Sequence, residues 1–266
     1  MSVKPVILKL GGSVITVKKK PLTPNRAAIR RLAREVASSK VASLILVHGG
    51  GSFGHPLAKH YAINEGYNGK ASQLLGFAKT HQAMVALNKL IVDSLIRSKI
   101  PAVAVSPSSC IVTKSGRIST FNEEPLSKLI QMGSVPVLYG DAVLDSDQGF
   151  AILSGDQLIA FLALRFNAER IIVGMDVDGL YATDPKTDSS AKLFSHVALK
   201  ELKNMQRQIG EAKVDDVTGG MLGKIKELIP AVEKGINVFF VNAAKPKNVY
   251  KALKNEHVIG THIEKG

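Results

Sequence analysis

Two glycine-rich segments that carry charged side chains are the parts of this sequence best suited to chemistry. KLGGS spans residues 9–13 and HGGGSFGH spans residues 48–55, and each directly follows a short apolar run. Glycines allow the backbone to approach a ligand closely, and their N–H groups bind anions. Lys9 adds a positive charge to the first segment, and His55 stands at the expected start of a helix. We interpret the second segment as phosphate-binding, whereas the first, taken alone, is equally compatible with a plain strand-to-loop turn.

The second segment partly matches two nucleotide-binding motifs. Gly49, Gly51 and Gly54 reproduce G-x-G-x-x-G, but no second strand ending in an acidic residue follows about twenty residues later. The P-loop spacing also fits, but His55 replaces the required lysine and Pro56 the serine or threonine. What remains is a row of N–H donors followed by a histidine, which suits a monophosphate or a transferring phosphoryl group. The histidines without this context are interpreted as structural: His48, His60, His81 and His196.

Carboxylates accompany glycines in three later segments. SGD at residues 154–156 opens an amphipathic helix, so Asp156 is either its N-cap or a site carboxylate. DVDGLY at residues 176–181 follows an apolar strand, and DVTGGM at residues 216–221 leads to Lys224 in the first turns of a helix. A nucleotide can lie across backbone amides at such transitions.

Alternation of short β-branched runs with amphipathic segments predicts the elements that position these residues. We expect a long helix over residues 72–98 and a β-hairpin between residues 142 and 153, on an otherwise parallel sheet. This pattern predicts an α/β fold, a three-layer αβα sandwich with a mostly parallel central sheet, and a site at the strand ends. Strands are expected at residues 6–10, 43–47, 102–105, 135–139, 170–173 and 237–241.

Length and composition limit the classes of protein to which the chain can belong. With 266 residues, 45% of them hydrophobic, it can bury one large core or two closely packed lobes, with a boundary near residues 154–168. No apolar run approaches the length of about eighteen residues expected of a membrane span, and Cys110 is the single cysteine, so we expect a cytoplasmic protein with no membrane partner. Cys110 itself is interpreted as a small buried residue.

The basic surplus is large, with 35 Lys and Arg against 22 Asp and Glu, a net charge of +13. These residues are scattered along predicted helices, and the chain has nine Phe, five Tyr and no Trp for base stacking. We therefore expect no nucleic-acid partner and interpret the charge as a solvated surface that also steers phosphorylated substrates.

The five motifs, in this order and at these separations, resemble the amino acid kinase family, which includes acetylglutamate kinase, aspartokinase, uridylate kinase and fosfomycin kinase. The resemblance covers essentially the whole chain. The final histidine of HGGGSFGH is similar to that of the isopentenyl phosphate kinases, which hold the acceptor phosphate with it. The resemblance implies an ATP- and Mg²⁺-dependent kinase that phosphorylates isopentenyl phosphate in isoprenoid biosynthesis and forms a homodimer. It also implies acceptor binding by residues 1–160 and nucleotide binding by residues 161–266.

The resemblance further implies roles for individual residues. Lys9 and Lys224 contact the ATP phosphates, Asp156 orients both lysines, and Lys18, rather than Lys19 or Lys20, assists transfer. No protein residue is expected to bind the metal, which the ATP phosphates hold. The nucleotide is expected near Gly11, Gly12, Ser13, Gly51, Asp176, Asp178, Gly179, Gly219 and Gly220, and the acceptor phosphate near Gly50, Gly51, Gly54, His55 and Gly155.

The apolar end of such an acceptor needs an apolar pocket. Candidates are Met84, with Ala83 and Leu87 on the long helix, and Phe150 with Ile152 in the hairpin. Each of these is equally interpretable as an ordinary core residue.

Two other kinds of function remain open. A fosfomycin-type kinase shares the histidine motif, whereas a carboxylate acceptor such as acetylglutamate gives no reason for His55. A nucleotide-sensing or nucleic-acid-binding relative without catalysis is the alternative of a different class. Retention of Lys9, Lys18, Lys224 and Asp156 argues against it.

Overall fold

The computed structural model describes residues 3–183, 185–204 and 219–266. The helices are α1 (Gly12–Ile15), α2 (Arg26–Ser39), α3 (Gly51–His60), η1 (Ile63–Glu65), α4 (Ala71–Arg97), α5 (Pro107–Cys110), α6 (Glu124–Gln131), α7 (Gly155–Arg165), α9 (Gly219–Glu233) and α10 (Asn248–Leu253). The strands are β1 (Val6–Leu10), β2 (Leu44–His48), β3 (Ala102–Ala104), β4 (Ile111–Lys114), β5 (Arg117–Phe121), β6 (Val135–Tyr139), β7 (Asp141–Asp145), β8 (Gly149–Leu153), β9 (Arg170–Met175), β10 (Leu180–Tyr181), β11 (Leu193–Phe194), β12 (His196–Ala198), β13 (Asn237–Asn242) and β14 (Gly260–Glu264).

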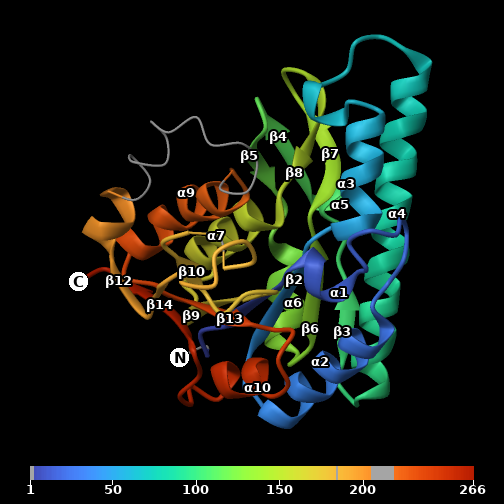
Figure 1. Cartoon of the computed structure of the whole chain (residues 1–266). Coiled ribbons are helices and arrows are strands. Elements are labelled where there is room, and N and C mark those ends of the chain that lie inside the picture. The colour runs from blue at the N-terminus through green and yellow to red at the C-terminus, as the bar shows by residue number, and fades with distance from the viewer. Residues whose placement is uncertain (1–2, 184, 205–218) are drawn as a thin grey trace.

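An eight-stranded sheet runs through the centre of the molecule in the order β12-β14-β13-β9-β1-β2-β6-β3 (Figure 1). All neighbouring strands are parallel except β13 and β14, so the predicted mostly parallel sheet is confirmed. β1 lies between β2 and β9, with Lys9 opposite Val47 on one side and Val173 on the other. The sheet therefore joins both halves of the chain around β1.

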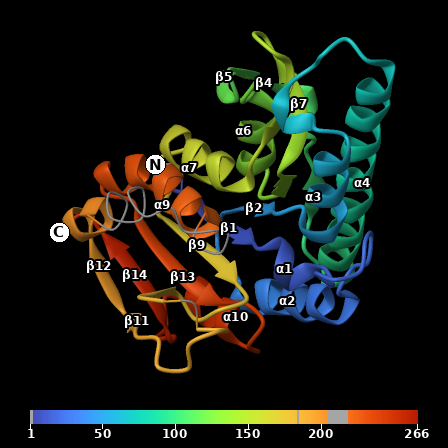
Figure 2. The same cartoon turned by 45° about the horizontal axis from the view of Figure 1, so that its top comes forward.

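Alternate residues of β1 enter two different cores, which makes the three layers. Leu8 packs with α2, α4 and α10, whereas Ile7 packs with α7 and α9 on the opposite face. Figure 2 shows these helix layers on either side of the sheet. Since side chains along a strand alternate between faces, Lys9 lies on the Ile7 face, toward α7. Among the described residues, no helix is both long and apolar enough to cross a membrane.

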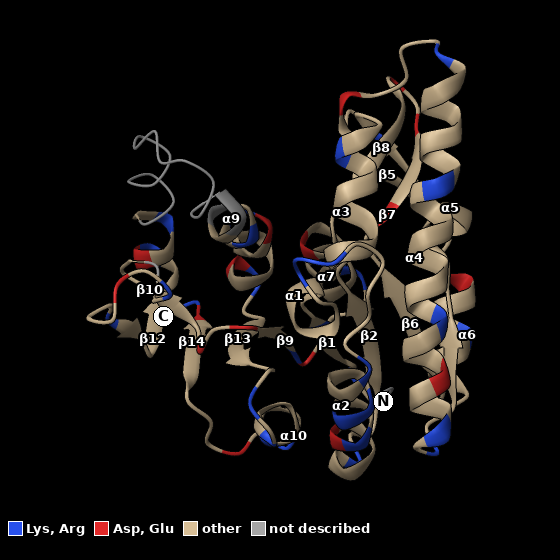
Figure 3. Cartoon of the chain, turned by 45° about the vertical axis from the view of Figure 1, so that its right-hand side comes forward, with Lys and Arg blue, Asp and Glu red and all other residues tan. Residues whose placement is uncertain are grey.

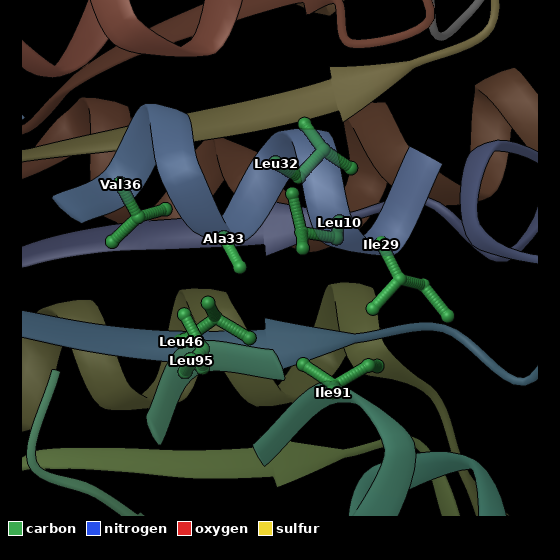
Figure 4. Close-up of a pocket in the computed structure, with 8 residues that line it drawn as sticks. All are labelled: Leu10, Ile29, Leu32, Ala33, Val36, Leu46, Ile91 and Leu95. Atoms are coloured by element: carbon green, nitrogen blue, oxygen red, sulfur yellow. The ribbon is translucent and has the colours of Figure 1, made fainter. Parts of the chain in front are cut away.

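The aliphatic core between α2, α4, β1 and β2 is closely packed. It encloses a cavity of only about 10 Å³, shown in Figure 4. A space of this size holds at most about one water, and an apolar lining disfavours even that. The cavity is a packing gap and no ligand site; its lining is Leu10, Ile29, Leu32, Ala33, Val36, Leu46, Ile91 and Leu95.

The predicted hairpin forms, but not as part of the central sheet. β7 and β8 pair antiparallel from Asp141–Leu153 to Asp145–Gly149. They belong to a separate four-stranded sheet in the order β5-β4-β7-β8, so the expected attachment to the parallel sheet was wrong. The sequence pattern did not predict β4 and β5 because they are short and β5 has no fully buried residue.

Asp145 ties the two hairpins of this small sheet together. Its carboxylate accepts hydrogen bonds from the Thr113 hydroxyl (2.8 Å) and the Gly116 amide (2.7 Å) of the β4–β5 hairpin. It also accepts from the amides of Asp147 (2.9 Å) and Gln148 (3.1 Å) in its own turn. Burial alone raises the pKa of Asp145, but these donors outweigh burial and lower the pKa to about 2.

We predict that Asp145→Asn destabilises the protein by about 1–3 kcal/mol at pH 7, because the amide cannot accept from all these donors. The folded-state pKa lies below the unfolded value, so the ionised carboxylate stabilises the fold above the unfolded pKa. That advantage disappears as the pH falls toward about 2. Urea unfolding of both proteins at pH 7 and at successively lower pH measures the difference. A difference that stays constant down to acid pH contradicts the assignment.

Candidate active site

Lys9, Asp156 and Lys224 form a charged cluster where β1 meets α7 and α9. Lys9 Nζ donates to Asp156 Oδ1 at 2.5 Å, and Lys224 Nζ lies 3.7 Å from Asp156 Oδ2. Ser154, not Asp156, is the N-cap of α7, since its side chain accepts from the Gln157 amide. The N-cap interpretation of Asp156 is therefore wrong, and its carboxylate is available to both lysines.

The cluster is electrostatically coupled. Burial lowers the pKa of Lys9, which is 5% exposed; the Asp156 charge raises it, and Lys224 lowers it. Burial raises the pKa of Asp156, but Lys9 and Lys224 outweigh burial and hold it below its usual value. Asp156 is therefore ionised at neutral pH. With both lysines protonated the trio carries a net positive charge, which an anionic ligand can neutralise.

The first turns of three helices meet beside this cluster. A β-carbon on Gly12, which begins α1, would lie 2.3 Å from the Gly51 nitrogen at the start of α3. Gly51 has φ +48° and faces Thr16 Oγ1, so a side chain there is excluded by conformation and by space. Gly155, which begins α7, lies against the aliphatic chain of Lys9. The first amides of a helix have no intrahelical acceptor and attract anions, so the site is built for phosphate groups.

His55 belongs to the same site. Burial by the surrounding chain lowers its pKa first, followed by the positive charges of Lys224 and then Lys9. His55 as a whole residue is exposed to solvent. A pKa below 6.5 makes the imidazole neutral at pH 7, so it donates one hydrogen bond to an anion rather than a full charge.

His48, seven residues earlier, is structural. It is fully buried, and burial lowers its pKa to about 4. Its ring stacks on Tyr139, and its Nε2 lies 3.2 Å from Asn88 Nδ2. The two histidines of one motif thus have different environments.

Gly50, the N-cap of α3, and Gly54 inside this helix both pack against Met84. The Met84 sulfur would lie 3.2 Å from a β-carbon on Gly50 and 2.9 Å from one on Gly54, so a side chain at either position requires Met84 to shift. Met84 is 1% exposed and belongs to the core of α2 and α4, as do Ala83 and Leu87. Met84 therefore packs between this core and the glycine segment.

Phe150 lies in a different cluster from Met84. Its ring stacks on Phe77 of α4, with centroids 5.2 Å apart, and packs at 5.6 Å against Tyr67. Ile152 joins this small cluster. The five predicted pocket residues therefore do not form one apolar group. Phe77 was missed in the sequence, where only its aromatic type distinguished it from other apolar residues of α4.

The nucleotide-side carboxylates are both engaged with neighbours. Asp176 accepts from Lys186 at 2.5 Å and from the Ser13 hydroxyl, and these partners hold its pKa low against the effect of burial. Asp178 accepts from Asn242 at 3.1 Å and from Lys245 at 3.0 Å. Ser13 follows Gly11 and Gly12, so Asp176 lies beside the cluster formed by the helix starts.

The remaining predicted residues occupy less distinctive places. Gly179 packs on Thr261, whose hydroxyl would lie 2.3 Å from an added β-carbon, so its glycine has a structural reason. Gly219 and Gly220 begin α9, whereas residues 216–218 of the same motif lie outside the described residues. Lys18 is exposed in the turn between Thr16 and Pro24.

Arg117 and Gln157 hold the cluster together and were missed in the sequence. Arg117 of β5 donates two hydrogen bonds, of 2.5 and 2.8 Å, to Glu227 of α9. Glu227 lies three residues after Lys224 on this helix. Gln157, next to Asp156, accepts from the Ile118 amide at 2.9 Å and donates to the Gly116 carbonyl at 3.0 Å. The β4–β5 hairpin thus contacts both helices of the charged trio, α7 with Asp156 and α9 with Lys224. No motif marks such long-range pairs.

The chemistry of this site is that of a phosphoryl-transfer enzyme: converging amides, two lysines and an orienting carboxylate. A search for known relatives gives the same class, since a profile of the "Amino acid kinase family" matches residues 4–242, and the chain belongs to this family.

Three relatives are similar over nearly the whole chain. The isopentenyl phosphate kinase of Methanothermobacter thermautotrophicus is 42% identical, covering 97% of this chain and 98% of its own. That of Methanocaldococcus jannaschii is 34% identical, with the same coverage of 97% and 98%. A solved structure described as "X-ray structures of isopentenyl phosphate kinase" has a TM-score of 0.86 at 39% identity, covering 97% of this chain and 99% of that one.

We predict that Asp156→Asn lowers the free energy of unfolding by roughly 3–5 kcal/mol, because it leaves the buried Lys9 ammonium without its counter-charge. Asp93→Asn is the matched control, since Asp93 pairs with the exposed Lys89 at 2.7 Å. Its loss should cost less than about 1 kcal/mol. Urea unfolding at pH 7 compares the two, and equal costs contradict the buried-pair assignment.

Proposed function

We propose that the protein transfers the γ-phosphoryl group of ATP to isopentenyl phosphate, giving isopentenyl diphosphate and ADP. The observation that carries the proposal is the Lys9–Asp156–Lys224 cluster next to His55 in the second turn of α3. The similarity to isopentenyl phosphate kinases over nearly the full chain supports the identity of the acceptor.

The chemistry needs no general base. An ionised oxygen of the acceptor phosphate attacks the γ-phosphorus, the bond from this phosphorus to the β,γ-bridging oxygen breaks, and ADP leaves with the electron pair. Lys9 and Lys224 neutralise charge on the transferring group, and Asp156 fixes their position. Gly12, Ser13 and Gly51 supply amides along this path. Lys18 is proposed to approach the transferring phosphoryl from its exposed turn.

Mg²⁺ fits this site as a companion of ATP rather than as a protein-bound ion. The described residues contain no group of three or more His, Cys, Asp or Glu that could hold a metal. Asp156 serves two lysines, and Asp176 and Asp178 each meet a lysine. We therefore propose that ATP phosphate oxygens hold the ion, which neutralises phosphate charge when bound.

His55 selects a phosphate acceptor. A neutral imidazole donates a hydrogen bond to a phosphate oxygen, and Gly50, Gly54 and Gly155 are proposed to meet that group through their backbone. The partly exposed members of the Phe150 cluster, among them Phe77 and Ile152, are proposed to meet the acceptor's apolar end. On this arrangement residues 1–160 bind the acceptor and residues 161–266 the nucleotide, with Asp176, Asp178, Gly179, Gly219 and Gly220 on the nucleotide side.

We also propose a cytoplasmic homodimer. The sheet ends at β3, where Val103 is 39% exposed, and Met132 of the nearby α6–β6 turn is 77% exposed. An exposed edge strand with apolar neighbours favours pairing with a second copy.

Burial raises the pKa of the Cys110 thiol to about 11, so it remains unreactive.

The direct test is ADP release from Mg-ATP with separate acceptors. Isopentenyl phosphate, dimethylallyl phosphate, fosfomycin, acetylglutamate and UMP form the panel. Preference for isopentenyl phosphate supports the proposal. Preference for fosfomycin means that the protein is a fosfomycin-type kinase instead. No turnover with any acceptor, together with retained ATP binding, favours a nucleotide-sensing protein.

We predict that His55→Ala raises the KM for isopentenyl phosphate at least about tenfold, because a hydrogen bond to a charged group contributes about 1.5–3 kcal/mol. The KM for ATP should stay near its wild-type value. His60→Ala is the control, since His60 is exposed at the other end of α3 and packs on Tyr61. Steady-state kinetics measure both, and an unchanged acceptor KM removes His55 from the site.

The Arg117–Glu227 pair is predicted to position Lys224. Arg117→Glu should lower kcat at least about tenfold, because a displacement of about 1 Å in a reacting group costs up to about 100-fold. Arg117→Glu combined with Glu227→Arg restores the ion pair and should recover most of the rate. The matched control is the exposed, bidentate Arg165–Glu123 pair, where Arg165→Glu should leave kcat unchanged. Failure of the swap to recover kcat contradicts the positioning role.

A further inference from the structure

A second basic site lies between α2 and the end of α4. The arginine hollow, as we call it, has a volume of about 380 Å³, which is within the range of about 300–1,000 Å³ typical of small-molecule sites. Figure 3 shows basic residues gathered along α2 and at the adjacent end of α4. The polar side chains that line the hollow are Arg30, Arg34, Ser38, Ser94, Arg97 and Ser98.

The hollow lies near the amino ends of the parallel strands, whereas the phosphate-transfer site lies at their carboxyl ends. α2 ends at Ser39 just before β2 begins at Leu44, and α4 ends at Arg97 just before β3 begins at Ala102. The catalytic cluster instead follows the carboxyl ends of β1 and β2. Since these strands are parallel, the two sites face different edges of the sheet.

The three arginines are not paired with carboxylates. In the part of the chain that the structure describes, the side chains of Arg30, Arg34 and Arg97 make no hydrogen bond or ion pair. The neighbouring carboxylates are used elsewhere. Glu35 pairs with Arg31 and accepts from the Lys247 and Tyr250 amides, and Asp93 pairs with Lys89.

A serine hydroxyl in the hollow also has no protein partner. Ser94 is 7% exposed and lines the hollow, yet among the described residues its hydroxyl has no hydrogen-bond partner. Ser39, buried to a similar degree on α2, instead donates to the Val36 carbonyl at 2.7 Å. The Ser94 hydroxyl is therefore able to donate a hydrogen bond to a ligand in the hollow.

Keeping these charges together opposes folding. Arg30 and Arg34 are four residues apart on one helix face, where like charges repel, and Arg97 adds a third charge. Guanidinium groups bind phosphate oxygens through paired hydrogen bonds, and serine hydroxyls add single donors. The lining contains no large apolar side chain, so it does not suit a hydrocarbon tail.

We propose that the arginine hollow binds a free, hydrophilic oligophosphate anion at a site separate from the catalytic centre. Three guanidinium groups, the Ser94 hydroxyl and the absence of large apolar side chains define this ligand class. The proposal does not depend on the identity of the phosphate acceptor.

The test is calorimetric titration of the full-length protein with tripolyphosphate, in low salt and with saturating ADP in the active site. The combined Arg30→Gln, Arg34→Gln and Arg97→Gln variant should bind at least about tenfold more weakly than the wild type, because three charge-assisted contacts are lost. The control variant combines Arg26→Gln, Lys40→Gln and Lys99→Gln. It removes the same charge from exposed residues near these helices but outside the hollow, and it should keep wild-type affinity.

Several outcomes overturn the proposal. Tripolyphosphate binding of equal affinity by the wild type and the hollow variant does so. An equal loss of affinity in the control variant also does so, because it indicates a diffuse electrostatic attraction to the whole basic surface. Sedimentation with vesicles that carry phosphatidylinositol bisphosphate tests a membrane source. Vesicle binding without a tripolyphosphate signal contradicts a free-anion site. Thermal melting checks the fold of each variant, and the hollow variant should melt no lower than wild type because its like charges are gone.

Discussion

The ion pair between Lys9 and Asp156 is the constraint on which the site depends. It places a lysine in the middle of a fully buried strand, where an uncompensated ammonium is unfavourable. Asp156 compensates it only because Ser154 takes over the capping of α7 and leaves the carboxylate unoccupied. The second oxygen of the same carboxylate then reaches toward Lys224 of α9. One carboxylate thus links the central strand with two helices.

The glycines follow from the same constraint. Two strands separate β1, which carries Lys9, from the edge strand β3, and three separate it from the edge strand β12, so ligand phosphates can reach Lys9 only beyond the strand ends. There the starts of α1, α3 and α7 must approach almost to backbone contact, and Gly12 and Gly51 permit this. The helix starts and the two lysines are therefore brought together by backbones that pack too closely for a β-carbon at Gly12 or Gly51.

The sequence predicted the features that depend on local patterns. β1 and β6 were predicted with their correct bounds, and the long helix was displaced by one residue at each end. The glycine motifs drew attention to Lys9, His55, Asp156 and Lys224 because each residue lies in, or within a few residues of, a glycine-containing segment near a strand end or helix start. The four-stranded sheet was not foreseen, since β5 alternates only between exposed and half-buried residues. Met84 and Phe150 were grouped because both are apolar, and only the fold separates them into two cores.

The residues that connect the two halves of the site could not be predicted from local patterns. Arg117 and Glu227 are 110 positions apart, and nothing in the sequence near either residue requires the other. Yet α9 is a surface helix with no sheet hydrogen bonds to fix its place, so side-chain contacts must do so. The β4–β5 hairpin bonds to Gln157 on α7 and to Glu227 on α9, one residue and three residues from the charged side chains. Because the small sheet is separate from the central one, it can contact both α7 and α9. These contacts hold Asp156 and Lys224 at a fixed separation.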